Sequence, residues 1–175
     1  YVQLSDMNGD DTPEVGMIGI LKRNNKIQVR VIDGSDDSNK LPSYNFGDDW
    51  ADYQWLSLPD IDFDNINDVG LYGRRLSNSR IQLFTKSGAD KAGTLGIYSW
   101  PEDLVEHKPL IVNDINFDGV KDFAVGGLRE NANRYQFIIK DGTNRSETLA
   151  NLGWPITLET PYFYEVNDID GDGML

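Results

Sequence analysis

The sequence predicts an all-β protein built from β-propeller blades, each of four antiparallel strands. Three observations support this prediction. An acidic stretch recurs at a constant interval, each interval holds four segments with strand-like alternation, and no segment has a convincing helical period. We expect about three blades plus part of a fourth. Because propellers usually have about four to eight blades, we expect the chain to be a fragment of a larger propeller.

The repeat is defined by four aspartates, and many other positions follow the same offset. Asp6, Asp60, Asp114 and Asp168 are equally spaced, which makes this a 54-residue tandem repeat. The offset also relates three further series: Gln28, Gln82 and Gln136; Gly34, Gly88 and Gly142; and Phe46, Trp100 and Trp154. We expect the glutamines to hydrogen-bond between strands or blades, and Trp100 and Trp154 to pack in the blade core rather than to stack on sugars. Residues 1–175 are therefore predicted to be one repeat array, with units of approximately 1–54, 55–108 and 109–162 and a partial unit 163–175.

Each unit is predicted to hold four short strands joined by tight turns. In the first unit they fall at about Val2–Leu4, Val15–Gly19, Ile27–Val31 and Leu41–Phe46, with a turn at Asp33-Gly34. The short strands before the next acidic loops are expected at 56–58, 110–112 and 164–166. Separate small β-domains are the alternative, but a domain as short as one repeat and without disulfides would be marginal alone, whereas stacked blades share their cores.

The acidic loops have the composition of calcium sites. Each has Asp, then Asp or Asn two residues on, Asp two further, and Asp or Glu four beyond. Calcium takes six to eight oxygen ligands in a flexible shell, while magnesium demands stricter octahedral geometry and fits less well. The predicted side-chain ligands are Asp6, Asn8, Asp10 and Glu14; Asp60, Asp62, Asp64 and Asp68; Asp114, Asn116, Asp118 and Asp122; and Asp168, Asp170 and Asp172. Backbone carbonyl ligands are expected at Thr12, Ile66 and Val120.

The residue after the third carboxylate is of a type that tolerates a left-handed backbone. It is Asp11, Asn65, Gly119 and Gly173 in the four loops, which indicates one shared geometry. An EF-hand fits poorly, because its twelfth position needs a bidentate Glu and these loops have an apolar residue there. Solvated acidic turns without metal are the alternative, although such crowded carboxylates would repel one another strongly.

The motif "DINFDGVKDFAVGG", which begins at Asp114 and lies between two predicted strands, resembles the FG-GAP and VCBS-type repeats. These repeats occur in integrin α-subunit propellers and in many bacterial secreted proteins. The resemblance covers the whole chain and implies a propeller with calcium in the loop between the first two strands of each blade. The literal Gly-Ala-Pro signature of the family is absent.

The composition limits the classes of partner that this chain is expected to bind. The formal net charge is −13, which argues against nucleic acid, and 14 of the 29 acidic residues lie in the four loops, so much of the acidity is accounted for by metal sites. No apolar run is long enough to span a membrane, and there is no cysteine. We expect an extracellular or cell-surface protein whose partners are calcium, an extracellular protein or carbohydrate, and further blades from a longer chain or from self-association.

The expected function is that of a calcium-stabilised, non-catalytic binding module rather than an enzyme. Catalytic motifs are missing from the sequence, and its one histidine, His107, is expected to be a surface residue. Because the same loop recurs in every unit, a structural role for the metal is favoured over catalysis. The alternatives are the propeller portion of a secreted polysaccharide lyase or hydrolase, and the scaffold of a large toxin or adhesin.

Overall fold

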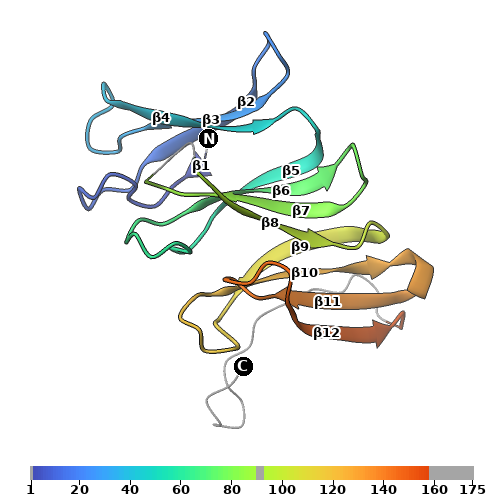
Figure 1. The fold of residues 1–175 in the computed structure, drawn as a ribbon. Coiled ribbons are helices and arrows are strands. Elements are labelled where there is room, and N and C mark those ends of the chain that lie inside the picture. Colours follow the sequence, from blue (N-terminus) through green and yellow to red (C-terminus); the bar gives the residue numbers. More distant parts are fainter. Residues whose placement is uncertain (1, 90–92, 158–175) are drawn as a thin grey trace. The chain divides into compact units, whose positions relative to one another are not determined.

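The computed structural model describes residues 2–89 and 93–157, which form three four-stranded antiparallel sheets (Figure 1). The predicted all-β, blade-like fold class is thereby confirmed. Within the described residues, the single helical element is a 3₁₀ turn at Glu130–Ala132. The chain divides into two compact units, Tyr1–Ile97 and Tyr98–Leu175, which we describe separately.

Each sheet keeps its strands in chain order, so that every strand pairs with the strand that follows it in the chain. The first sheet consists of β1 (Val2–Gln3), β2 (Val15–Ile20), β3 (Ile27–Ile32) and β4 (Lys40–Gly47). The second consists of β5 (Trp50–Ser57), β6 (Val69–Arg75), β7 (Ile81–Lys86) and β8 (Thr94–Trp100). The third consists of β9 (Leu104–Val112), β10 (Asp122–Arg129), β11 (Arg134–Lys140) and β12 (Thr148–Pro155).

Two strands are longer than the sequence predicted. β5 and β9 were expected only at 56–58 and 110–112, yet both start well before these residues. The reason is a bulge in each strand, where the register shifts and one residue, Asp52 or Glu106, takes a left-handed backbone with φ of 50° or 52°. The bulge absorbs one extra residue and lets pairing resume beyond it. The strand expected at 164–166 lies outside the described residues.

The core of the first unit lies between the inner faces of its two sheets. Alternate residues of β3 and β4 face the second sheet, and Val29, opposite Tyr44 in the register, is fully buried. The Tyr44 and Phe46 rings each lie 5.8 Å from the Trp55 ring, and Phe46 lies 6.1 Å from Phe84 in an edge-on arrangement. Aromatic pairs of this geometry add about 0.5–1.5 kcal/mol beyond their buried area.

A buried tyrosine bond recurs at the repeat interval. The Tyr44 hydroxyl donates to the Gly88 carbonyl at 2.9 Å, which joins the last strand of the first sheet to the turn after β7. In the second unit the Tyr98 hydroxyl donates to the Gly142 carbonyl, in the turn after β11. Both tyrosines are fully buried. Each of these tyrosines therefore holds the Gly turn of the following repeat.

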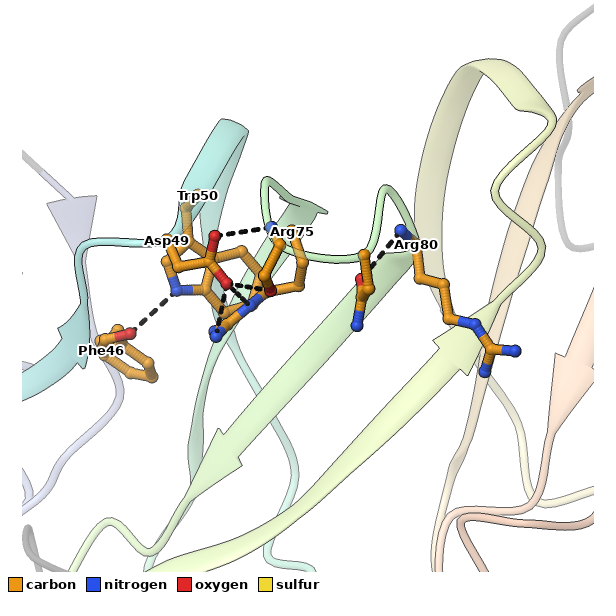
Figure 2. Close-up of polar contacts among 7 residues, drawn as sticks. Phe46, Asp49, Trp50, Arg75 and Arg80 are labelled. Atoms are coloured by element: carbon orange, nitrogen blue, oxygen red, sulfur yellow. Dashed lines mark hydrogen bonds and ion pairs between the residues drawn. The ribbon is translucent and has the colours of Figure 1, made fainter.

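In the second sheet, an ion pair lies at the end of the strands away from the acidic loop (Figure 2). Asp49 accepts from the Arg75 guanidinium at 3.0 Å and from the Ser77 N–H at 2.8 Å, and the guanidinium lies 4.6 Å from the Trp50 ring centre. The Trp50 indole N–H in turn donates to the Phe46 carbonyl at 2.8 Å. In the second unit the equivalent pair is Asp103 and Arg129, at 2.6 Å.

The glutamine series behaves as expected, but the aromatic series only in part. Gln28 and Gln136 donate across the sheet to asparagines on the neighbouring strand, at 3.0 and 2.8 Å. Phe46 and Trp100 are buried, whereas Trp154, expected in the core, is 42% exposed. That prediction is wrong because most of β12 is exposed, whereas Tyr44 and Phe46 of β4 pack in the core with the second sheet.

Replacing Tyr44 by Phe should destabilise the protein by about 1–3 kcal/mol, because the Gly88 carbonyl is left buried without a donor. Denaturant unfolding would measure the change. The control is Tyr135→Phe, at a half-buried tyrosine on β11, which should stay within about 0.5 kcal/mol of the wild type. Equal effects for both variants would contradict the role given to Tyr44.

Candidate metal centre

The three described acidic loops occupy equivalent places, between the first two strands of each sheet. They connect β1 to β2, β5 to β6 and β9 to β10. This is the position that the resemblance to calcium-binding repeats implied. The fourth loop, with Asp168, Asp170 and Asp172, lies outside the described residues.

The first aspartate of each loop gathers backbone N–H groups around itself. Asp6 accepts from Gly9 at 2.7 Å and from Asp11 at 2.8 Å, through different carboxylate oxygens. Although partial burial opposes it, these bonds hold the pKa of Asp6 below its usual value. The matching bonds run from Asn65 to Asp60 at 2.8 Å and from Gly119 to Asp114 at 2.7 Å. The loop backbone is therefore wound about an ionised carboxylate.

The third carboxylate fixes the second half of the loop. One oxygen of each accepts the N–H two residues on, from Thr12 to Asp10 at 2.9 Å, Ile66 to Asp64 at 2.8 Å and Val120 to Asp118 at 3.0 Å. Thr12, Ile66 and Val120 thus occupy the place from which a carbonyl ligand was expected, and their coordination stays a prediction. The other oxygen of Asp10 and of Asp118 accepts from a second turn, described below.

The predicted left-handed residues are confirmed. Asp11, Asn65 and Gly119 have φ of 66°, 67° and 96°. A second left-handed position, which the sequence did not reveal, lies two residues earlier, where Gly9 is followed at the repeat interval by Phe63 and Phe117 with φ of 62° and 60°. A left-handed backbone costs a non-glycine residue about 1–2 kcal/mol. The loops therefore adopt a strained path that the carboxylate hydrogen bonds must maintain.

The last acidic residue of each loop is fully buried, unlike the other three. Glu14, Asp68 and Asp122 are all 0% exposed. Asp68 accepts from the Ile61 N–H at 2.7 Å with one oxygen and from the Gly88 N–H at 2.9 Å with the other. Asp122 repeats both bonds, from Ile115 and Gly142, each at 2.9 Å. Burial raises the pKa of all three, that of Asp68 to about 6.

Glu14 is the residue whose environment calls most directly for a cation. Its Oε2 accepts from the Met7 N–H at 2.7 Å, but its Oε1 is buried without a hydrogen-bond partner. An ionised carboxylate without compensation is costly in an apolar environment, so a buried one is normally paired, or coordinates a metal. Glu14 lies with Asp6 and Asp10 in a group whose carboxylate oxygens are within 4.8 Å of one another.

The second loop forms a similar group and the third does not. Asp60, Asp62 and Asp68 bring carboxylate oxygens within 4.8 Å of one another. The third ligand of the first loop, Asp10, belongs to the first group, whereas its equivalent in the second loop, Asp64, does not belong to the second group. Within the described residues, Asp114, Asp118 and Asp122 share the hydrogen bonds of the other loops but not this close spacing of oxygens.

The glycine of the turn after the third strand approaches the loop too closely for any side chain. A Cβ on Gly88 would lie 2.1 Å from the Asn67 carbonyl oxygen, and one on Gly142 would lie 2.3 Å from that of Lys121. This contact brings the glycine N–H within reach of Asp68 or Asp122. Glycine is therefore required at Gly88 and Gly142, because only a residue without a side chain lets the turn pack against the loop and bind the buried carboxylate.

The same turn adds a carboxylate that sequence reasoning missed. Asp33, predicted only as a turn residue, accepts from the Asn8 side-chain amide at 3.0 Å, and Asp141 accepts from Asn116 at 2.9 Å. Both aspartates are buried. The signal in the sequence was available, because the turns follow the loops at a constant distance and the two residues share the 54-residue register.

No protein-family model matches this chain, and a comparison with the curated proteins finds no match. Of the helices in the described part of the chain, none is long and apolar enough to cross a membrane.

His107, expected on the surface between blades, is half-buried and lies within β9.

The donor set suits a hard cation. All predicted ligands offer carboxylate, amide or backbone oxygen, which are the ligands of Ca²⁺, and neither the loops nor the turns beside them contain histidine or cysteine. Glu14, whose Oε1 is buried without a donor, has a carboxylate oxygen within 4.8 Å of those of Asp6 and Asp10, which fits an ion among them. The residues present therefore fit calcium.

The buried carboxylates predict an unusual pH dependence for the calcium-free protein. Because the folded-state pKa of Asp68 is about 6, above the unfolded value of about 3.9, the folded state binds more protons between these values. The free energy of unfolding should therefore rise as the pH falls from 7 to 5. Asp33, whose pKa is held at about 2 by the Ser35 hydroxyl and N–H, opposes this trend only below about pH 4.

Denaturant unfolding in calcium-free buffer at several pH values would measure this dependence, with Asp68→Asn as the matched variant. The variant cannot titrate at this position and should show a smaller rise. With saturating calcium the trend should reverse, because protons then compete with the ion. A calcium-free wild type that loses stability steadily from pH 7 to pH 5 would contradict the account.

Proposed function

We propose that this chain is a calcium-stabilised, non-catalytic β-propeller module of a secreted or cell-surface protein, and that its surface binds an extracellular protein or a carbohydrate. The proposal follows the resemblance to FG-GAP and VCBS-type repeats. The observation that carries it is the buried carboxylate at the base of each described loop, above all Glu14, whose Oε1 has no protein donor.

A structural role for the ion is supported by what its ligands hold. Asp68 accepts from the Gly88 N–H, and the carbonyl of Gly88 accepts from the buried Tyr44 hydroxyl of the preceding repeat. An ion that fixes Asp68 therefore also fixes the turn that the neighbouring sheet binds. In the second unit, Asp122, Gly142 and Tyr98 form the same chain of bonds.

Further blades are supported by a difference in exposure between equivalent residues. Val69 and Leu71 of the second sheet are buried, with exposures of 1% and 0%, and lie in the core formed with the first sheet. Their equivalents one repeat earlier, Val15 and Met17, are 46% and 47% exposed. We propose that another blade covers this face of the first sheet, from a longer chain or from self-association.

A binding role rather than a catalytic one is supported by two features of the sequence. It follows from the replication of the loops, which favours stabilisation over catalysis, and from the acidic surface, which does not suit nucleic acid.

Calcium should raise the melting temperature and a chelator should lower it. With a dissociation constant of about 10⁻⁴ M and millimolar calcium, each site would contribute about 1.4 kcal/mol. Thermal unfolding with EGTA and after calcium is added back would measure the effect, and magnesium would serve as the control cation. A melting temperature that does not respond to calcium would refute the proposal.

Replacing Asp114 by Ala should abolish one site and leave the others, because it removes the carboxylate around which that loop is wound. Equilibrium dialysis would then show one bound calcium fewer than in the wild type. The exposed Asp48, which lies outside all four loops, provides the control variant Asp48→Asn, which should bind as many ions as the wild type. Loss of all binding in Asp114→Ala would contradict independent sites.

A further inference from the structure

The three described sites differ in sequence in a coordinated way. The first and third have Asn at the second ligand position and Asp in the turn that follows the third strand of the sheet, namely Asn8 with Asp33 and Asn116 with Asp141. The second has Asp62 with Ser87 at these two positions. The carboxylate that the first and third sites have in the turn is thus found within the loop in the second site, at the position that faces the turn.

The hydrogen bonds explain why the two places are exchangeable. The Asn8 amide N–H₂ donates to Asp33 at 3.0 Å, and that of Asn116 donates to Asp141 at 2.9 Å. A carboxylate can only accept, so it orients the amide with its nitrogen toward the turn and its carbonyl oxygen toward the loop. Consistent with this, the Asn8 carbonyl oxygen accepts from the Asp10 N–H inside the loop, at 3.0 Å. An Asp at this position needs no such orientation.

The hydroxyl group beside the third ligand also differs in position between the second site and the other two. In the first and third sites a hydroxyl two residues beyond the turn aspartate lies between that aspartate and the third ligand. Ser35 is 2.7 Å from Asp10 and 2.6 Å from Asp33, and Thr143 is 2.6 Å from Asp118 and 2.8 Å from Asp141. The second site has Ala89 at this position and has no hydroxyl to offer from there. Its hydroxyl comes from Ser87, which donates to Asp64 at 3.4 Å.

The number of carboxylates at the ligand and turn positions is the same in each site. It is four: Asp6, Asp10, Glu14 and Asp33; Asp60, Asp62, Asp64 and Asp68; and Asp114, Asp118, Asp122 and Asp141, whereas Asp11 of the first loop is at none of these positions. A constant number of carboxylates at changed positions is what a bound cation requires, since its affinity depends on the number of charged groups around it. Solvated turns would gain nothing from it.

We propose that Asp33 and Asp141 are positioning residues of the first and third cation sites, each orienting the adjacent Asn toward the ion and supplying the fourth negative charge that Asp62 supplies within the second loop. Both are buried, with exposures of 6% and 4%, and the carboxylate oxygen that does not bind the Asn amide accepts a backbone N–H, from Ser35 at 2.8 Å or from Thr143 at 2.6 Å. In the first site an independent observation indicates a ligand, namely the buried, unpartnered Oε1 of Glu14. This inference rests on the proposed calcium sites.

The exchange within the sequence provides the test. Asp33→Ser alone should weaken calcium binding at the first site by about 10–100-fold, the usual cost of removing a group that orients a metal ligand. Asn8→Asp together with Asp33→Ser copies the arrangement of the second site and should recover most of the loss. Asp33→Asn keeps a hydrogen-bond acceptor in the turn and removes only the charge, so it should also bind more weakly than the wild type.

Titration of the calcium-free protein with calcium, followed by NMR, reports each site separately. The amide of Gly9 lies in the first loop and that of Gly119 in the third, so the third site is an internal reference in every variant. In Asp33→Ser the Gly9 signal should respond only at higher calcium, while the Gly119 signal should follow the wild-type curve. Asp48→Asn is the control for loss of one surface charge elsewhere.

The outcomes separate the two proposals. If neither glycine responds to calcium in the wild type, the proposed calcium sites are wrong. If both respond, but Asp33→Ser and Asp33→Asn bind calcium at the first site as tightly as the wild type, the inference about Asp33 is overturned and the calcium sites stand. A double variant no better than Asp33→Ser would show that the two positions do not exchange their charge, which would also overturn it.

Discussion

The arrangement of each repeat depends on one costly feature, a carboxylate buried at the base of the acidic loop. Glu14, Asp68 and Asp122 are fully buried, and burial favours their uncharged form. An ion bound beside them would remove this cost, while the protein alone offers only backbone N–H groups. At Asp68 and Asp122 the loop, the glycine turn and the preceding repeat are joined through this group, because the turn N–H binds the carboxylate and the turn carbonyl binds a tyrosine.

This connection would give a bound metal an influence beyond its loop. A single repeat is too short to have much core of its own, and the buried aromatic residues around Tyr44 lie between two sheets rather than within one. The Tyr44 bond fixes the first sheet to a turn whose position is set by Asp68. Calcium bound to Asp68 would therefore stabilise both the fold of the second sheet and the packing of the first sheet upon it.

Much of the fold and of the acidic loops could be predicted from the sequence, because a residue type that recurs at the same position of each repeat is a stronger signal than one that occurs once. The fold class, the strand-flanked loops and the left-handed Asp11, Asn65 and Gly119 followed from residue types at fixed spacing. The burial of Trp154 was predicted wrongly because burial depends on what another part of the chain places against it. Asp33 was missed because a turn aspartate satisfies local rules so well that its distant partner, Asn8, leaves no local sign.

The central claim is that a calcium ion neutralises the buried carboxylate of each loop. Anomalous X-ray diffraction from crystals grown in millimolar calcium would test it most directly. The account predicts an anomalous peak in each of the first three loops, in the first at about 2.3–2.6 Å from Oε1 of Glu14 and from the carboxylates of Asp6 and Asp10. Loops without anomalous density at that calcium concentration, with Glu14 Oε1 paired to a protein donor, would contradict it.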